Sequence, residues 1–244
     1  MREMITVKEV CLALLAASLA LPPAFAFEDA AHLQNSEPIS AESSKSAIAN
    51  TPTLRVLASS HKGARFGKEK ASPQALHVAN WVVDSSDNAG MPFMIVDKVL
   101  ARVLIFDADG SLQGAAPALL GLARGDNSTP GIGQRKISSI RPDERTTPAG
   151  RFIASLGRDV YGEEMLWVDY DTAISLHPIV KGTPAERRGQ RLNSPSPDDN
   201  RISYGCINVP LKFYELLVRQ AFTGTSGIVY IAGNPASARS IRVL

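Results

Sequence analysis

Short apolar runs separated by polar turns dominate the sequence after residue 75. The first of them places apolar residues at helical spacing around Trp81, which predicts a short helix. β-Rich residues then fill Phe93–Val96 and Val99–Phe106. The turn Asp107–Gly110 leads into a return strand from Ser111 onward. The pattern therefore predicts a helix followed by a β-hairpin.

Further short strands are expected along the rest of the chain. β-Rich stretches predict strands at Gly150–Ser155, Met165–Asp169 and Ala173–His177, and a final core strand at Gly227–Ala232. A helix is predicted to start at Pro210, because apolar residues recur at helical spacing after it. Many short strands with long loops and few helices predict a mainly β fold in a single domain.

The first 75 residues have a different texture. Basic residues, a short apolar run and an Ala-x-Ala site predict that residues 1–26 are a secretory signal peptide. An uncleaved anchor is the alternative, but an apolar run of about 12 residues is too short to span a bilayer. Residues 27–75, rich in Ser and Ala, are predicted to be a disordered linker. Residues 76–244 remain as the packed domain, with no stable membrane span after signal cleavage.

Composition narrows the function classes. The chain has 26 Lys and Arg against 24 Asp and Glu, so it lacks the basic excess expected of a nucleic-acid-binding protein. Its 2 cysteines and 4 scattered histidines fit neither a disulfide framework nor a zinc site. We therefore expect no nucleic-acid partner, no metal and no cofactor.

Signal cleavage removes Cys11 and leaves Cys206 as the one cysteine of the mature chain. A lone exported cysteine is read as an intermolecular disulfide or a free reactive thiol, and the alternative is an inert buried side chain. Gly205 permits a tight turn before it. His177 closes a predicted strand, and imidazole is the usual partner of a reactive thiolate. These neighbours favour a nucleophilic cysteine.

Three segments together carry a resemblance. The sequence S-Y-G-C-I-N at Ser203–Asn208 resembles the [S/T]-H-G-C-x-[N/R] signature of the L,D-transpeptidases, the YkuD-type cysteine enzymes of bacterial cell walls. Thr147–Phe152 resembles the T-P-x-G-x-F segment of that family, and the hairpin Arg102–Leu112 resembles its early strand pair. The three segments also occur in the family's order.

The resemblance implies a fold and a set of roles. The fold would be an L,D-transpeptidase-like β-sandwich catalytic domain. Cys206 would be the nucleophile and His177 the base that generates its thiolate. Gly205 and Cys206 would donate backbone N–H groups to the oxyanion. Ser203 would support the loop or the histidine, and Asn208 would fix the loop after the nucleophile.

One departure from the family pattern is Tyr204, which stands where the signature has histidine. A tyrosine hydroxyl can form hydrogen bonds but does not titrate near neutral pH. His177 is then left as the only base, and Tyr204 is predicted to contact substrate.

A second departure is the long stretch Lys181–Arg201 between the histidine and the cysteine. It is rich in arginine, and Arg191 and Arg201 are predicted to bind carboxylates of the wall peptide as parts of a lid. A solvated charged loop is the alternative.

The implied activity is that of a periplasmic L,D-transpeptidase of a Gram-negative-type envelope, which cross-links peptidoglycan stem peptides through a Cys206 thioester. The sequence leaves 3,3 and 1,3 cross-links open. It also leaves open an L,D-carboxypeptidase, a protein-anchoring transferase and a non-catalytic wall-binding module.

Other sequence patterns give weaker indications of function. Ser59–Lys62, Ser86–Asn88 and Lys181–Thr183 are similar to the three boxes of serine β-lactamases, but the last is scrambled and the boxes lie too close together. Solvation at the surface is the expectation for three arginines outside the signature segments: Arg124, Arg135 and Arg145.

Overall fold

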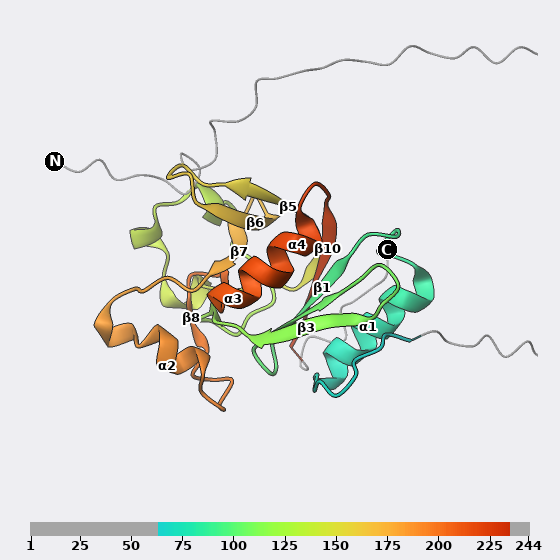
Figure 1. The fold of residues 1–244 in the computed structure, drawn as a ribbon. Helices are drawn as coiled ribbons and strands as arrows, with labels where there is room; N and C mark the ends of the chain where they lie inside the picture. The colour runs from blue at the N-terminus through green and yellow to red at the C-terminus, as the bar shows by residue number, and fades with distance from the viewer. Residues whose placement is uncertain (1–62, 235–244) are drawn as a thin grey trace, which may run out of the picture. The chain divides into compact units, whose positions relative to one another are not determined.

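Ten strands form two sheets in residues 63–234, the part of the chain that the computed structural model describes (Figure 1). The large sheet has the order β3-β2-β1-β10-β5-β6-β7-β9, and β4 and β8 form a separate pair. The strands are β1 (Phe93–Asp97), β2 (Arg102–Phe106), β3 (Leu112–Pro117), β4 (Leu120–Gly121), β5 (Gly150–Arg158), β6 (Glu164–Asp169), β7 (Ile174–Pro178), β8 (Arg201–Ser203), β9 (Ile207–Val209) and β10 (Gly227–Ala232). The mainly β prediction is confirmed, and the expected sandwich takes the form of one continuous eight-stranded sheet beside a small one.

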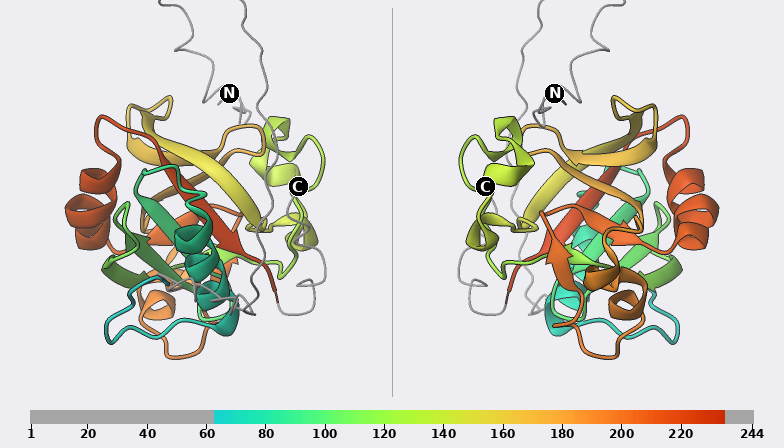
Figure 2. Two further views of the ribbon diagram at one scale, coloured as in Figure 1. Left: turned by 90° about the vertical axis from the view of Figure 1, so that its right-hand side faces the viewer. Right: turned by 90° about the vertical axis from the view of Figure 1, so that its left-hand side faces the viewer.

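Helices cover both faces of the large sheet (Figure 2). On one face, α1 (Pro73–Ser85) packs on Phe93 and Ile95 of β1. Met94 and Val96 point to the opposite face and join a second apolar cluster. That cluster includes a C-terminal helical segment made of α3 (Leu211–Phe213), the π-helical η5 (Tyr214–Val218) and α4 (Arg219–Phe222). The side-chain alternation of β1 thus feeds two cores at once.

The remaining helices are short and lie in two loops. The loop after β4 contains η1 (Ile132–Gln134), η2 (Ile137–Ser139) and η3 (Pro142–Glu144). The loop after β7 contains η4 (Pro184–Glu186) and α2 (Arg188–Leu192). Both loops lead to the candidate site described below.

Most predicted elements are present with shifted ends. The helix around Trp81 begins at Pro73, because the hydroxyl of Ser72 caps it by accepting a hydrogen bond from the Ala75 N–H at 3.2 Å. The strand predicted from Ala173 begins one residue later, since Ala173 has the left-handed φ of 57°. The helix predicted from Pro210 is interrupted by the π-helical turn of η5.

Contacts of the packed domain reach beyond the predicted boundary at residue 76. Phe66 packs edge-on against Phe106, with ring centroids 5.2 Å apart. The N–H of Ser72 donates to Asp97 at 2.7 Å. The predicted signal peptide and residues 27–62 of the predicted linker lie outside the described residues. Within residues 63–234, no helix is long and apolar enough to cross a membrane.

Candidate active site

Parallel pairing of β7 with β9 brings the predicted histidine and cysteine together. His177 is in register with Asn208, and Cys206 lies just before β9. The His177 ring lies within reach of the Cys206 sulfur and acts on its pKa. The two residues come from segments far apart in sequence, and adjacent strand ends place them side by side.

The electrostatics of this pair favour a thiolate. Burial raises the pKa of the Cys206 thiol, but the hydrogen bond and positive charge of His177, with hydrogen bonds from Ser175, outweigh it and lower the pKa to about 7. Burial lowers the pKa of His177, whereas its hydrogen bond to Cys206 and its contact with Pro178 raise it, and the net shift is upward. Both shifts favour the charged forms of the pair, a thiolate and an imidazolium.

The tautomer of His177 follows from its second contact. Nδ1 lies 2.8 Å from the carbonyl oxygen of Pro178, which can only accept, so Nδ1 carries a proton. Nε2 is then the nitrogen that can take a proton from the thiol. Pro178, the next residue of β7, thus fixes the orientation and tautomer of the His177 ring.

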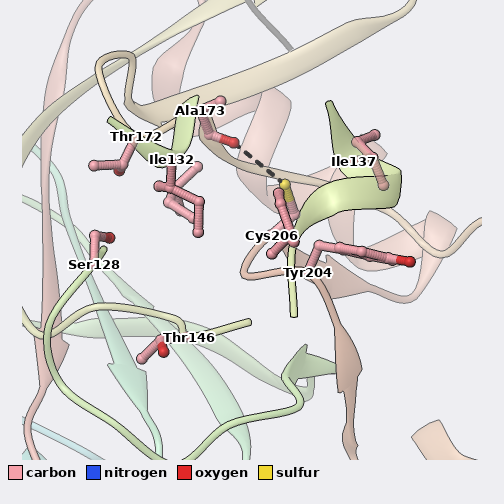
Figure 3. Close-up of a pocket in the computed structure, with 10 residues that line it drawn as sticks. Ser128, Ile132, Ile137, Thr146, Thr172, Ala173, Tyr204 and Cys206 are labelled. Carbon is pink, nitrogen blue, oxygen red and sulfur yellow. Dashed lines mark hydrogen bonds between the residues drawn. The ribbon is translucent and has the colours of Figure 1, made fainter. Parts of the chain in front are cut away.

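The Cys206 sulfur faces a pocket (Figure 3). Ser175 Oγ donates to the sulfur at 3.6 Å, and the thiol donates to the Ala173 carbonyl at the same distance. Ser175 and His177 are two residues apart on β7, so both side chains lie on one face of the strand. Ten residues line the pocket: Ser128, Ile132, Ile137, Ile140, Thr146, Thr172, Ala173, Ile174, Tyr204 and Cys206. The mostly apolar walls explain why burial acts so strongly on the thiol.

A tight turn presents the cysteine. Gly205 has a φ of 135°, and a Cβ there would lie 2.7 Å from both Ile174 Cδ1 and the Thr146 carbonyl oxygen, so only glycine fits. Ser203 Oγ accepts from the Gly205 N–H at 3.1 Å and donates to the Cys206 carbonyl at 2.6 Å. Because the Gly205 N–H already has this partner, it is not the free oxyanion donor that the resemblance implied. Ser203 closes the turn.

Thr147, from the T-P-A-G segment, contacts the same turn. Its hydroxyl donates to the Gly205 carbonyl at 2.7 Å and accepts from the Gly121 N–H at 2.9 Å. The side chain is fully buried. Two motifs that are remote in sequence thus meet in one hydrogen-bond chain that fixes the backbone before Cys206.

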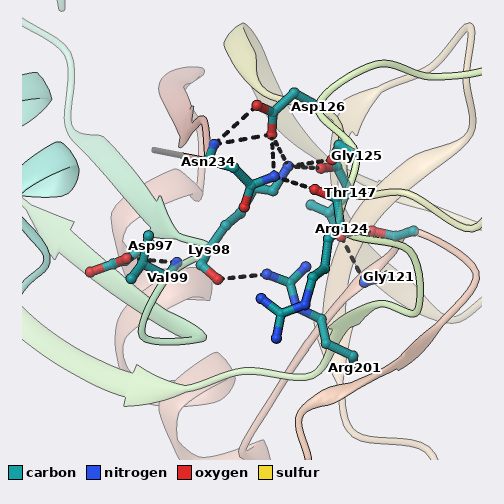
Figure 4. Close-up of polar contacts among 11 residues, drawn as sticks. Asp97, Lys98, Val99, Gly121, Arg124, Gly125, Asp126, Thr147, Arg201 and Asn234 are labelled. Carbon is teal, nitrogen blue, oxygen red and sulfur yellow. Dashed lines mark hydrogen bonds and ion pairs between the residues drawn. The ribbon is translucent and has the colours of Figure 1, made fainter. Parts of the chain in front are cut away.

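A buried lysine supports Thr147 in turn (Figure 4). Lys98 Nζ donates to Asp126 at 2.6 Å and to the carbonyls of Gly125 and Thr147, both at 2.7 Å. These three acceptors match the three N–H donors of an ammonium group. Burial lowers the pKa of Lys98, and Asp126 opposes that shift. The ammonium ties the end of β1 to the segment that holds the turn.

The loop after β7 is anchored on the other side of the cysteine. Asn208 is fully buried, and its Nδ2 donates to the Cys206 carbonyl at 3.3 Å. Arg188 Nη1 donates to Asn208 Oδ1 at 3.1 Å, and its Nε pairs with Glu186 at 2.6 Å. Arg188 also lowers the pKa of His177 through its positive charge. The charged loop therefore contacts the strands that carry His177 and Asn208.

Arg191 and Arg201 are not placed as expected. Arg191 donates to the carbonyls of Glu186 and Asp199, which keeps its own loop folded. Arg201 is buried and donates to the Lys98 carbonyl at 2.6 Å (Figure 4). Neither side chain is among the residues that line the Cys206 pocket. The direction of β8 explains the difference for Arg201, which points to the lysine cluster and away from the groove.

Tyr204 lies at the rim of the pocket, with 37% of its surface exposed. The guanidinium carbon of Arg145 lies 4.0 Å from the centre of its ring. Arg145 was expected to be solvated, and instead it contacts a residue of the site. Sequence reasoning missed this contact because nothing in the spacing of the two residues links them.

Three further residues of the site were not foreseen. Ser175 was detectable, since a strand places it on the same face as His177. Thr147 was named as part of a motif but without a role. Arg188 belongs to an arginine-rich loop, and the sequence carries no signal for which arginine turns inward.

Comparisons with known proteins give a partial likeness. No family model matches this chain, and no curated protein matches it. Two similar solved structures are the NMR structure of the catalytic domain of an E. faecium L,D-transpeptidase and a structure of the LD transpeptidase LdtMt1 in complex with imipenem. The first has a TM-score of 0.32 and 18% identity over 58% of this chain and 97% of that one. The second has a TM-score of 0.35 and 13% identity over 58% of each chain. Since both scores and both identities are low, function is inferred from the site itself.

Proposed function

We propose that this protein is a cysteine acyltransferase with L,D-transpeptidase activity on peptidoglycan stem peptides. The observation that carries the proposal is the placement of His177 beside Cys206 by the β7–β9 pairing, where the imidazole lowers the thiol pKa to about 7 next to a pocket. A thiolate at neutral pH, a positioned imidazole and a pocket for the acyl group are the parts that covalent acyl transfer requires.

Two motifs of the resemblance support the choice within this class. Thr147 of the T-P-A-G segment donates to the carbonyl of Gly205, the residue before the nucleophile. A chance match of either motif would have no reason to make this contact. The contact therefore supports reading the two segments as parts of one transpeptidase-like site.

The reaction proceeds in two steps. The Cys206 thiolate attacks a carbonyl of the donor stem peptide, and the C–N bond breaks as the His177 imidazolium gives its proton to the leaving amine. The product is a thioester. An amine of a second stem peptide then attacks, His177 accepts its proton, a new C–N bond forms and the C–S bond breaks. The thiolate and the imidazolium are restored, so no cofactor or external energy source enters.

The transition state carries an oxyanion that needs donors. The Gly205 N–H is bonded to Ser203, so the Cys206 N–H is the backbone donor assigned to this role. Asn208 and Ser203 hold the carbonyl of Cys206 and thereby fix the peptide plane that follows the nucleophile. Their function is positioning.

The acceptor decides between related activities. Water as acceptor would give an L,D-carboxypeptidase, and an amine on an envelope protein would give an anchoring transferase. The predicted signal peptide at residues 1–26 supports a periplasmic location, where the peptidoglycan substrate lies. A non-catalytic wall-binding module is the rival from another class, and the activated thiol argues against it.

The test is incubation of the purified protein with muropeptides, followed by mass spectrometry of the products. We expect cross-linked dimers from the wild type and none from Cys206→Ala or Cys206→Ser. Binding to peptidoglycan without any new product would overturn the enzyme in favour of the binding module. Since LdtMt1 has been solved with imipenem, the same carbapenem is a suitable acylating probe of Cys206.

A further inference from the structure

An arginine that has no acidic partner within residues 63–234 contacts Tyr204 at the rim of the Cys206 pocket. Arg145 stacks on the Tyr204 ring at 4.0 Å, the geometry of a cation–π contact. Tyr204 itself lines the pocket. The aromatic ring that replaces the histidine of the family signature thus positions a fixed positive charge.

Backbone contacts hold this guanidinium in place. Its Nε and Nη2 donate to the Ile140 carbonyl at 3.4 and 3.3 Å, and the Arg145 carbonyl accepts from the Ala123 N–H at 2.9 Å. Ile140 and Tyr204 both line the pocket, so the guanidinium bridges two of its walls. Nη1 forms none of these bonds, which leaves its two N–H groups for a ligand.

The charge of Arg145 is not neutralised within the described residues 63–234. The neighbouring arginines of the same loop are each paired: Arg135 with Glu144 at 2.7 Å and Arg141 with Asp143 at 3.2 Å. Arg145 has neither a carboxylate partner nor an ion pair in that part of the chain. The lowered pKa of Cys206 is due to His177 and Ser175. The charge is thus available to a molecule outside the chain.

We propose that Arg145, held on the face of Tyr204, binds a carboxylate of the donor peptide and so selects anionic stem peptides. A planar guanidinium with free N–H groups recognises carboxylates bidentately. This inference rests on the proposed function, since the carboxylate belongs to the peptide whose carbonyl Cys206 attacks. It also gives Tyr204 a role as the platform of the guanidinium.

The test compares a peptidoglycan tetrapeptide with forms of it in which each carboxylate is amidated in turn. Initial rates give kcat and KM for the wild type, Arg145→Gln and Arg145→Lys. We expect one amidated form to raise the wild-type KM about 10- to 100-fold, the loss of one charged hydrogen-bonded contact. For Arg145→Gln, the KM for every peptide should match the raised KM of the wild type for that amidated form, and kcat should be nearly unchanged. The KM values of Arg145→Lys should lie between those of the wild type and Arg145→Gln, because lysine keeps the positive charge but loses the bidentate geometry of the guanidinium.

Matched variants separate binding from structure. Arg158→Gln removes an arginine remote from the pocket, whose Nη1 donates to the Gly162 carbonyl, and should leave every KM unchanged. Tyr204→Phe keeps the ring face and should retain the discrimination, whereas Tyr204→Ala should lose part of it. The pH midpoint of Cys206 alkylation should be the same in Arg145→Gln and the wild type.

Two failures are distinguishable. A wild type that turns over no peptide would overturn the proposed function and this inference with it. A wild type that turns over peptides while Arg145→Gln still distinguishes the acid from its amides would overturn this inference alone.

Discussion

The two halves of the large sheet differ in how fully their strands are buried. In β2, β1 and β10 of the first half, apolar side chains are buried on both faces, against α1 on one and the C-terminal helical segment on the other. In the other half, β7 and β9 are largely buried, but β5 and β6 are only partly so, and Ile153 of β5 is 66% exposed. The site lies at the end of this second half. Apolar burial stabilises both halves, and in the second half hydrogen bonds also shape the site.

This difference separates stability from chemistry. Apolar burial is non-directional, so a truncation in the first half lowers the free energy of unfolding and leaves the site intact. A hydrogen bond around Cys206 sets the position of one atom, so its loss changes the rate more than the fold. The following substitutions test that separation.

The largest effect is expected at the base. His177→Ala should lower kcat for cross-linking by about 10²- to 10⁴-fold, the usual contribution of a positioned acid–base group. The pH midpoint of Cys206 alkylation should rise well above its wild-type value of about 7, because the burial that raises the thiol pKa remains after the imidazole has gone. Iodoacetamide labelling across pH measures this shift. A variant that cross-links at the wild-type rate would show that another group is the base.

A truncation in the first half should change stability alone. Leu104→Ala removes a fully buried side chain of β2 and should lower the free energy of unfolding by about 2–5 kcal/mol. The folded variant should keep its kcat. Denaturant unfolding measures the loss, and Leu211→Ala, at a side chain that is 52% exposed, is the matched control. A fall in kcat equal to that of the site variants would break the separation between the halves.

The Thr147 hydroxyl is expected to affect both the stability of the fold and the position of Cys206. Thr147→Val keeps the shape of the side chain but leaves the Gly205 carbonyl and the Gly121 N–H without this partner. We expect the free energy of unfolding to fall by about 1–3 kcal/mol and kcat to fall with it. Thr225→Val, at an exposed threonine, should change neither. Unchanged acylation kinetics in Thr147→Val would show that the hydrogen bonds of the Thr147 hydroxyl do not position the cysteine.

The smallest effect is expected at Ser175. Its hydrogen bonds lower the pKa of Cys206, so Ser175→Ala should raise that pKa, while the backbone N–H of residue 175 keeps its contribution. The rate near neutral pH should then fall by no more than about tenfold. Labelling across pH should place the midpoint between those of the wild type and His177→Ala. A midpoint as high as that of His177→Ala would contradict the ranking of the two contacts.

The features that depend on local sequence pattern could be predicted from the sequence. β-Rich runs and the Asp107–Gly110 turn predicted the hairpin, and Cys206 with His177 was predicted from residue chemistry and the resemblance. The rest depends on contacts between distant segments. Lys98 reads as a surface residue after a strand, yet it is buried because three acceptors converge on its ammonium. Local spacing also carries no sign that Arg145 meets Tyr204.

The misplaced arginines have the same cause. Arg201 and Arg191 were assigned to substrate from the composition of their loop, which does not define the direction of a side chain. The start of β8 turns Arg201 toward the Lys98 carbonyl, and the fold of the loop turns Arg191 onto its own backbone. Arg188, which shares that composition, is the arginine that reaches Asn208.

The central claim is that His177 makes Cys206 a nucleophile in acyl transfer. Intact-protein mass spectrometry after incubation with imipenem at neutral pH, followed by peptide mapping, tests it most directly. The account predicts one adduct, located on Cys206, that forms far more slowly in His177→Ala and not at all in Cys206→Ala. An unmodified Cys206, or an adduct that forms equally fast without His177, would contradict it.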